Sequence, residues 1–170
     1  MADTVRKKAL DSLKNHLKGE AWVVSGGVGI NPGKTLYKKA EMPGISIFVG
    51  DEQGGPNKYG VQNHIVPIEL KYIDLHDSDI TTVFDSAEEV RGQMIQSVMT
   101  ATFGGLATKK EYTGGGIDYP DKDDESYQIS ITVTIEYETK WCDPYTSTVT
   151  ETHLGTGDFE TTGEITGGTS

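Results

Sequence analysis

The chain has 170 residues and a formal net charge of −11, from 15 Lys/Arg and 26 Asp/Glu. This length fits one domain, and the single Cys142 excludes both an internal disulfide and a zinc site built from several cysteines. The acidic charge argues against general binding to nucleic-acid phosphates. No membrane span is expected because no window of about 18 apolar residues occurs, and residues 1–19 are too polar for a signal peptide.

The charge is unevenly distributed along the chain. Residues 1–40 carry eight Lys/Arg and three Asp/Glu, whereas residues 41–170 carry seven and 23. Two solvated faces of opposite charge would explain this. The alternative is head-to-tail contact between identical subunits, because each copy then offers both signs.

The first half of the sequence predicts one helix and three strands. A helix is expected over 3–18, where Val5, Ala9, Leu13 and Leu17 recur every four residues. Short apolar or alternating runs predict strands at 21–25, 45–49 and 66–72, with loops over 26–44 and 51–60. Pro67 cannot donate to a ladder, so the third strand is expected at a sheet edge or with a bulge there.

The second half predicts one helix and one long strand. Ser86 and Glu89 form a capping box that predicts a helix start, and Gly104 and Gly105 are expected to end that helix. Apolar residues alternate with polar ones from Tyr127 to Thr139, which is typical of a strand. Residues 104–125 are expected to form a long loop, in which 106–112 could add a hairpin strand.

These elements predict an α+β fold in the order α-β-β-β-α-β. The simplest arrangement is a mainly antiparallel sheet of about four strands with two amphipathic helices on one face. Residues 1–145 are expected to form a single domain. Residues 146–170, rich in Thr and Gly and with only acidic charges, are expected to be a C-terminal arm that becomes ordered on a partner.

One glycine-rich segment resembles a phosphate-binding loop. Residues 26–35 read GGVGINPGKT after a predicted strand and end in Gly-Lys-Thr. The P-loop pattern needs a glycine where Val28 stands, and Pro32 removes one of the amides that would cradle phosphate. We therefore expect a flexible loop here rather than a nucleotide site.

The remaining polar residues give no chemical signature. Cys142 could act as a nucleophile with His16, His64, His76 or His153 as its base, but an incidental thiol is the simpler reading. Metal-ligand types occur at His64, Asp74, His76, Asp77 and Asp79 without a known spacing. Asp121, Asp123 and Asp124 lack the Gly and Glu of a calcium loop. We expect no cofactor and no enzymatic activity.

The order of elements resembles the tail terminator proteins of long-tailed bacteriophages. The resemblance covers residues 3–145. It comprises the N-terminal helix, the strands at 21–25 and 65–75, the segment MPGISIFV at 42–49, the helix 87–102, and the strand 129–137 followed by Asp143-Pro144-Tyr145. It implies a small α+β subunit that forms a hexameric ring at the head-proximal end of the tail tube. Such a ring stops tube growth and meets the head connector.

The resemblance carries over no individual residue, so contact residues are predicted from charge and loop length. Subunit contacts are expected at Arg6, Lys7, Lys8, Lys38 and Lys39. The tube or connector is expected to meet the 104–125 loop, in particular Gly114, Gly115, Gly116, Asp121, Asp123 and Asp124.

The expected partners are therefore other copies of the chain, the tube protein and the connector. DNA is expected to pass through the ring without specific binding, and the virion is the expected location after synthesis in the host bacterial cytoplasm. Another neck ring, a tail tube subunit and a monomeric adaptor or ligand-binding domain remain alternatives.

Overall fold

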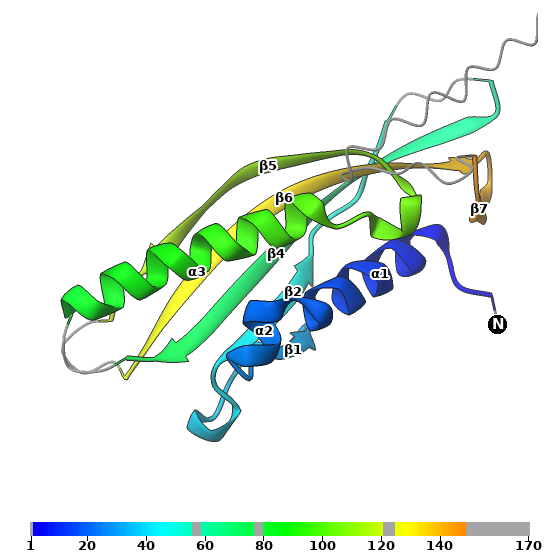
Figure 1. Ribbon diagram of the computed structural model, residues 1–170. Coiled ribbons are helices and arrows are strands. Elements are labelled where there is room, and N and C mark those ends of the chain that lie inside the picture. The colour runs from blue at the N-terminus through cyan, green and yellow to red at the C-terminus, as the bar shows by residue number, and fades with distance from the viewer. Residues whose placement is uncertain (1, 56–58, 77–79, 121–124, 149–170) are drawn as a thin grey trace, which may run out of the picture.

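The computed structural model describes residues 2–55, 59–76, 80–120 and 125–148. The chain is an α+β protein in which one mixed, mostly antiparallel sheet carries helices on one face (Figure 1). The helices are α1 (Val5–Gly19), α2 (Ala21–Ser25) and α3 (Ile80–Thr100), with short 3₁₀ turns η1 (Lys39–Glu41) and η2 (Phe103–Gly105). The strands are β1 (Gly29–Pro32), β2 (Gly44–Val49), β3 (Gln53–Gly54), β4 (Val61–Leu75), β5 (Ala107–Asp118), β6 (Ser126–Lys140) and β7 (Asp143–Ser147).

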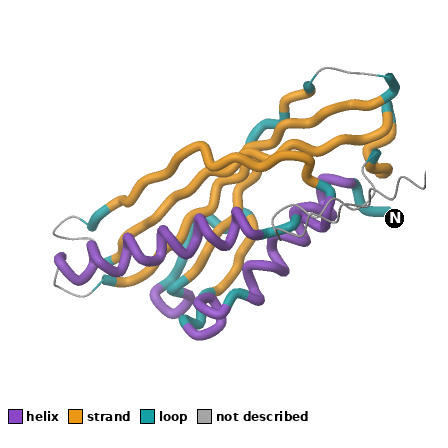
Figure 2. The backbone as a smooth tube through the Cα atoms, turned by 45° about the horizontal axis from the view of Figure 1, so that its top comes forward, coloured by secondary structure: helices purple, strands orange, loops and turns teal. Residues whose placement is uncertain are grey.

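The sheet runs in the order β1-β2-β4-β6-β5, with β3 beside β4 and β7 beside β6. Among the described strands, β1 and β2 pair in parallel and every other pair is antiparallel. Strands β4 and β6 pair without interruption over 15 residues, from Val61 opposite Lys140 to Leu75 opposite Ser126. These two strands form the long axis of the molecule and extend past the helices at one end (Figure 2).

The core lies between the sheet and the layer of α1 and α3 (Figures 1 and 2). Side chains alternate between the two faces of a strand, and one set from β4 and one from β6 faces the helices. Helix α1 contributes the predicted stripe at every fourth residue, and Lys7 N–H donates to the Thr4 hydroxyl at its N-terminus, 3.2 Å away. The buried residues from these three elements are Val5, Ala9, Leu13, Leu17, Val66, Ile68, Leu70, Tyr72, Tyr127, Ile129, Ile131, Val133, Ile135 and Tyr137.

The predicted strand at 21–25 is wrong, because these residues form the single-turn helix α2. Helical packing buries Val23 and lets the Trp22 indole N–H donate to the Ser97 hydroxyl of α3 at 2.9 Å. An apolar run of five residues does not distinguish a strand from a helical turn. The predicted loop over 26–44 is also wrong in part, since it contains β1, which pairs with β2 from Gly29–Gly44 to Pro32–Ile47.

Pro67 does not mark an edge strand, because β4 lies in the interior of the sheet between β2 and β6. The Pro67 carbonyl accepts from Gly50 N–H at 2.9 Å, so this carbonyl points to the break between β2 and β3. A residue's N–H and C=O point to the same side of an antiparallel strand. Proline lacks the N–H that would point to the same break, and no residue of β2 or β3 pairs with Pro67 there.

Helix α3 begins at Ile80, so the predicted capping box is wrong: Ser86 and Glu89 lie inside the helix. The buried stripe of α3 already includes Val83, four residues before Ala87. The glycines that follow the helix have positive φ, 68° at Gly104 and 71° at Gly105, as expected of residues that turn the chain after a helix.

The C-terminal end of α3 is bound by a lysine from β5. The Lys110 ammonium donates to the carbonyls of Met99 and Ala101, and burial lowers the pKa of Lys110. The Met99 carbonyl is one of the last four of α3, which lack a partner within the helix, and Ala101 directly follows the helix. A cation there suits the negative end of the helix dipole.

A Lys110→Met variant is expected to lose about 1–3 kcal/mol of unfolding free energy, because half-buried carbonyls lose their donor. Urea denaturation measures this loss. Lys109→Met, at the exposed neighbouring position, is the matched control, and equal stability of the two variants would contradict the assigned role.

Candidate functional site

The predicted contact loop at 104–125 is for the most part strand β5, which confirms the hairpin alternative and extends it. Gly114, Gly115 and Gly116 all lie in β5 and pair with Thr132, Ile131 and Ser130 of β6. A Cβ on Gly115 would stand 2.2 Å from the Ser130 carbonyl oxygen, so glycine permits the close approach of the two strands. Asp121, Asp123 and Asp124 lie outside the described residues.

The predicted basic residues divide into two groups. Arg6, Lys7 and Lys8 lie at the start of α1, whereas Lys38 and Lys39 lie at η1, between β1 and β2. Three of the five bind acids of the same chain: Arg6 pairs with Glu52 at 3.8 Å, Lys7 with Asp3 and Asp11 at 3.2 and 2.7 Å, and Lys39 with Glu125. Within the described part of the chain, Lys8 and Lys38 are exposed and form no ion pair.

The two edges of the sheet differ in the sign of their charge. Strand β1 is one outer strand and lies on the side of α1, which carries five Lys/Arg and one Asp. Strand β5 is the other and lies on the side of α3, and these two elements together carry five Asp/Glu and three Lys/Arg. We call these the basic edge (α1, β1 and the segment 33–41) and the acidic edge (α3 and β5).

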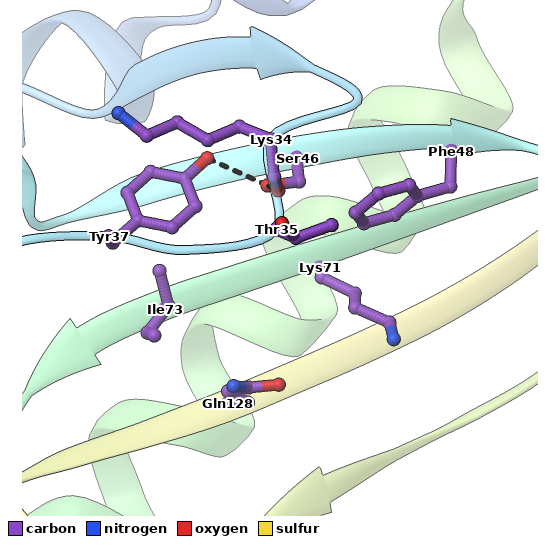
Figure 3. Close-up of a pocket in the computed structure, with 8 residues that line it drawn as sticks. All are labelled: Lys34, Thr35, Tyr37, Ser46, Phe48, Lys71, Ile73 and Gln128. Atoms are coloured by element: carbon purple, nitrogen blue, oxygen red, sulfur yellow. Dashed lines mark hydrogen bonds between the residues drawn. The ribbon is translucent and has the colours of Figure 1, made fainter.

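A hollow of about 250 Å³ lies on the sheet face opposite the helices (Figure 3). The segment 34–37 crosses this face beside β2, so that Ser46 beneath it is only 2% exposed. The Tyr37 and Ser46 hydroxyls lie 2.8 Å apart, and the Ser46 hydroxyl donates to the Lys34 carbonyl. Lys71 and Gln128 form the opposite wall, from β4 and β6.

The two lysines of this hollow do not make it a strong anion site. The Lys34 ammonium extends over the Tyr37 ring and away from Lys71 (Figure 3), and it pairs with Glu41 at 2.7 Å. The Lys71 ammonium lies 3.6 Å from Glu69. Each cation is thus already beside a carboxylate, which leaves little net charge to attract an anion.

The glycine-rich segment is not arranged to hold phosphate. Gly29 N–H donates to the Pro43 carbonyl at 3.1 Å and Gly33 N–H to the Ile47 carbonyl at 2.9 Å. Phosphate-binding loops need successive backbone amides that are free to converge on the ligand. In this chain the sheet occupies those amides, and Lys34 is followed by an irregular segment instead of a helix.

A polar cluster joins α1 to the extended ends of β4 and β6. His64 places Nδ1 3.2 Å from the Glu52 carboxylate and Nε2 2.9 Å from the Thr139 hydroxyl, and its ring stacks on Tyr137. The Tyr137 hydroxyl donates to Glu52, and burial, followed by this carboxylate, raises the Tyr137 pKa. Thr139 is 3% exposed, so its hydroxyl is enclosed by the strand pair. Because Glu52 also pairs with Arg6, the cluster holds the projecting strands against α1.

Cys142, which the sequence indicates to be an incidental thiol, lies near His64, one of the bases considered for it. Cys142 is exposed and lines a hollow of about 330 Å³ together with His64. Both ring nitrogens of His64 already face Glu52 and Thr139. The imidazole is therefore not placed to take a thiol proton, which a cysteine nucleophile requires.

The candidate metal ligands are not brought together. His64 and Asp74 stand ten residues apart on β4, which is about 33 Å in a strand, and Asp77 and Asp79 lie outside the described residues. Among the residues that the structure describes, no three His, Cys, Asp or Glu side chains gather as they would around a metal ion. Over the same residues, no helix has the length and apolar character to cross a membrane.

A scan of family models and a search of curated proteins found no match to this chain.

One hollow on the helix side of the sheet, lined by Tyr72 and Asp74 of β4, was not predicted from the sequence. The apolar stripe of β4 that faces the helices, Val66, Ile68, Leu70 and Tyr72, continues at the same spacing to Asp74. An acid at a core-facing position was the signal that could have found it. The same alternation that predicted the strand places this carboxylate beside the helices.

Proposed function

We propose that this chain is a structural subunit of a bacteriophage tail. Copies form a closed ring, a hexamer as in the family that the chain resembles, at the head-proximal end of the tail tube. The ring ends tube polymerisation and meets the head connector on its other side. Its location is the virion, after synthesis in the host cytoplasm.

The observation that carries this proposal is the separation of charge between the two sheet edges. A ring needs a heterologous contact, in which one surface of a subunit meets a different surface of the next. The basic edge and the acidic edge are two such surfaces on one chain, and opposite charges favour their meeting in one orientation. Lys8 and Lys38 are exposed cations of the basic edge, and neither ammonium forms an ion pair within the described chain.

The sheet face opposite the helices supports a role next to DNA. Up to Glu138 its outward positions on β6 are Gln, Ser, Thr and Glu, and its Lys71 and Lys109 pair with Glu69, Glu111 and Glu136, whereas Lys140 at the end of β6 is exposed. A polar face whose cations are mostly beside carboxylates would hold DNA phosphates only weakly by charge. In the proposed ring this face lines the channel, and DNA passes without specific binding.

A tail tube subunit is the second candidate. The sheet has seven strands, including two of 15 residues, where the sequence predicted about four strands in all. Tail tube subunits are mostly β-structure, so this larger sheet fits a tube subunit better than the four strands predicted from the sequence. Another neck ring and a monomeric adaptor remain the further alternatives.

Electron microscopy of tails made with and without the protein tests the proposal. Overlong or headless tails are expected without it, and normal tails are expected when it is restored. Loss of all tubes would instead identify a tube subunit. Normal, joined tails in its absence would contradict any part in tail assembly.

A further inference from the structure

A hollow of about 430 Å³ opens between the N-terminal half of α3 and the sheet, with α2 at one side. Its floor is formed by Tyr72 of β4 and Tyr127 of β6, each only 5% exposed, with ring centres 6.2 Å apart. Trp22 of α2 lines one side and Val83 and Val90 of α3 line another. The lining thus combines an aromatic floor and apolar valines with polar side chains, namely Ser25, His76, Thr82, Ser86 and Gln93.

Two carboxylates stand at this hollow. Asp74 is half-buried and accepts from the Tyr72 hydroxyl at 3.1 Å and from Leu75 N–H at 2.8 Å. Glu89 of α3 lines the same hollow from the opposite side. Within the described ranges, neither carboxylate lies within ion-pair distance of a lysine or arginine.

Among its described lining residues the hollow has no lysine or arginine, and His76 lines it as well. Burial raises the pKa of Tyr72 and of Tyr127, and the charge of Asp74 adds to both shifts. The two phenols thus stay protonated, and Tyr72 donates one hydrogen bond to the carboxylate without neutralising it. A cation brought to this carboxylate would gain a charge-assisted hydrogen bond.

We propose that this hollow binds a cationic group on an apolar stem, an alkylammonium or alkylguanidinium of the kind that lysine and arginine side chains carry. The stem packs against Trp22, Tyr72 and Tyr127, as the methylene groups of lysine and arginine pack on apolar surfaces. The cation pairs with Asp74 and Glu89 and lies close enough to the rings to gain from their π-faces.

Such a group has two possible sources, a free small molecule or a basic side chain of a second copy. The second source rests on the proposed function, since it requires self-association. The basic edge would supply it, because several of its lysines are exposed. Two experiments on the full chain separate these sources.

The first experiment uses Trp22 as the reporter. Trp22 and Trp141 are the only tryptophans, and Trp141 directly follows the end of β6, so in a Trp141→Phe variant the tryptophan fluorescence comes from Trp22 alone. Titration with N-acetylarginine amide is expected to give a saturable change in fluorescence. N-acetylcitrulline amide, the neutral isostere, is expected to give none.

Two variants in the same background locate the response. Asp74→Asn keeps an acceptor for Tyr72 and removes the charge, and it is expected to weaken binding at least tenfold, about the value of a charged hydrogen bond. Asp51→Asn, at an exposed position between β2 and β3, should bind as the parent does. Equal binding by all three proteins, or none by the parent, would contradict a free-ligand site.

The second experiment is carbodiimide cross-linking of mixed ¹⁴N- and ¹⁵N-labelled chains, followed by peptide mapping. A mixed-label link from Asp74 or Glu89 to a lysine supports a second copy as the source. A titration response without that link supports a free ligand. If both experiments fail, the inference is wrong, whereas the solution mass of the wild-type chain still decides the proposed ring.

Discussion

A Lys8→Glu/Lys38→Glu double variant is expected to lose self-association by about a hundredfold or more. Both side chains are exposed cations on the basic edge, and neither has an ion pair within the described chain. Placing like charges across a contact costs several kcal/mol, and each 1.4 kcal/mol is a factor of about ten in affinity. Sedimentation equilibrium or native mass spectrometry measures the change.

The variant separates assembly from folding. Lys8 lies near the N-terminus of α1, where the helix dipole favours an acid over a base, so Lys8→Glu should not destabilise the helix. Lys140→Glu, at an exposed position outside the basic edge, is the matched control and should associate normally.

A charge exchange sharpens the test. Asp85→Lys/Asp118→Lys on the acidic edge should also prevent association, and the four changes in one chain should restore it. Normal association of the Lys8→Glu/Lys38→Glu variant would show that the two edges do not meet.

An Ile131→Ala variant is expected to lose about 2–5 kcal/mol of unfolding free energy. Ile131 is fully buried at the middle of β6, opposite Leu70 of β4. Removing its side chain leaves a cavity between the sheet and the helices, which packed neighbours fill only in part. Urea denaturation measures the loss, together with the slope that reports surface exposed on unfolding.

Thr132→Ala is the matched control on the adjacent residue. Thr132 points to the opposite face of the sheet and is half-buried, so its truncation should cost under about 1 kcal/mol. Similar losses for the two variants would mean that β6 does not present alternate faces to core and solvent, and the assigned orientation of the sheet would be wrong.

The long periodic segments of this chain could be predicted from the sequence. Helix α1 and strands β4 and β6 each repeat a 3.6- or 2-residue pattern over many residues, so local sequence suffices to identify them. The short elements could not be predicted in the same way. Five residues at α2 and four at β1 hold too few repeats to reveal a period, and β1 becomes a strand only because β2 pairs with it.

Strand β5 was obscured by its own irregularities. Its register shifts between Ala107 and Lys109 and again between Tyr112 and Gly114, which breaks the alternation that marks a strand. The three glycines that follow suggest a loop when they are read locally. Glycine is needed at Gly115 because the β6 backbone approaches closely there. The sequence of β5 alone does not reveal this approach.

The candidate site, too, could be predicted only in part from the sequence. The unequal charge of residues 1–40 and 41–170 is visible in the sequence. Its placement at opposite edges depends on the strand order, in which β5 is added outside β6 and β1 outside β2. Internal pairing, such as Arg6 with Glu52 and Lys39 with Glu125, also depends on long-range contacts and reduces the number of cations free for a partner.

The uninterrupted ladder between β4 and β6 has a mechanical consequence. A pull applied along the strand direction at opposite ends of the pair acts on all of its hydrogen bonds in shear, so they must break together. A pull across the strands would instead open them one at a time. The molecule should therefore resist stretching along its long axis far better than peeling at its edges, and single-molecule force measurements in the two geometries would give very different rupture forces.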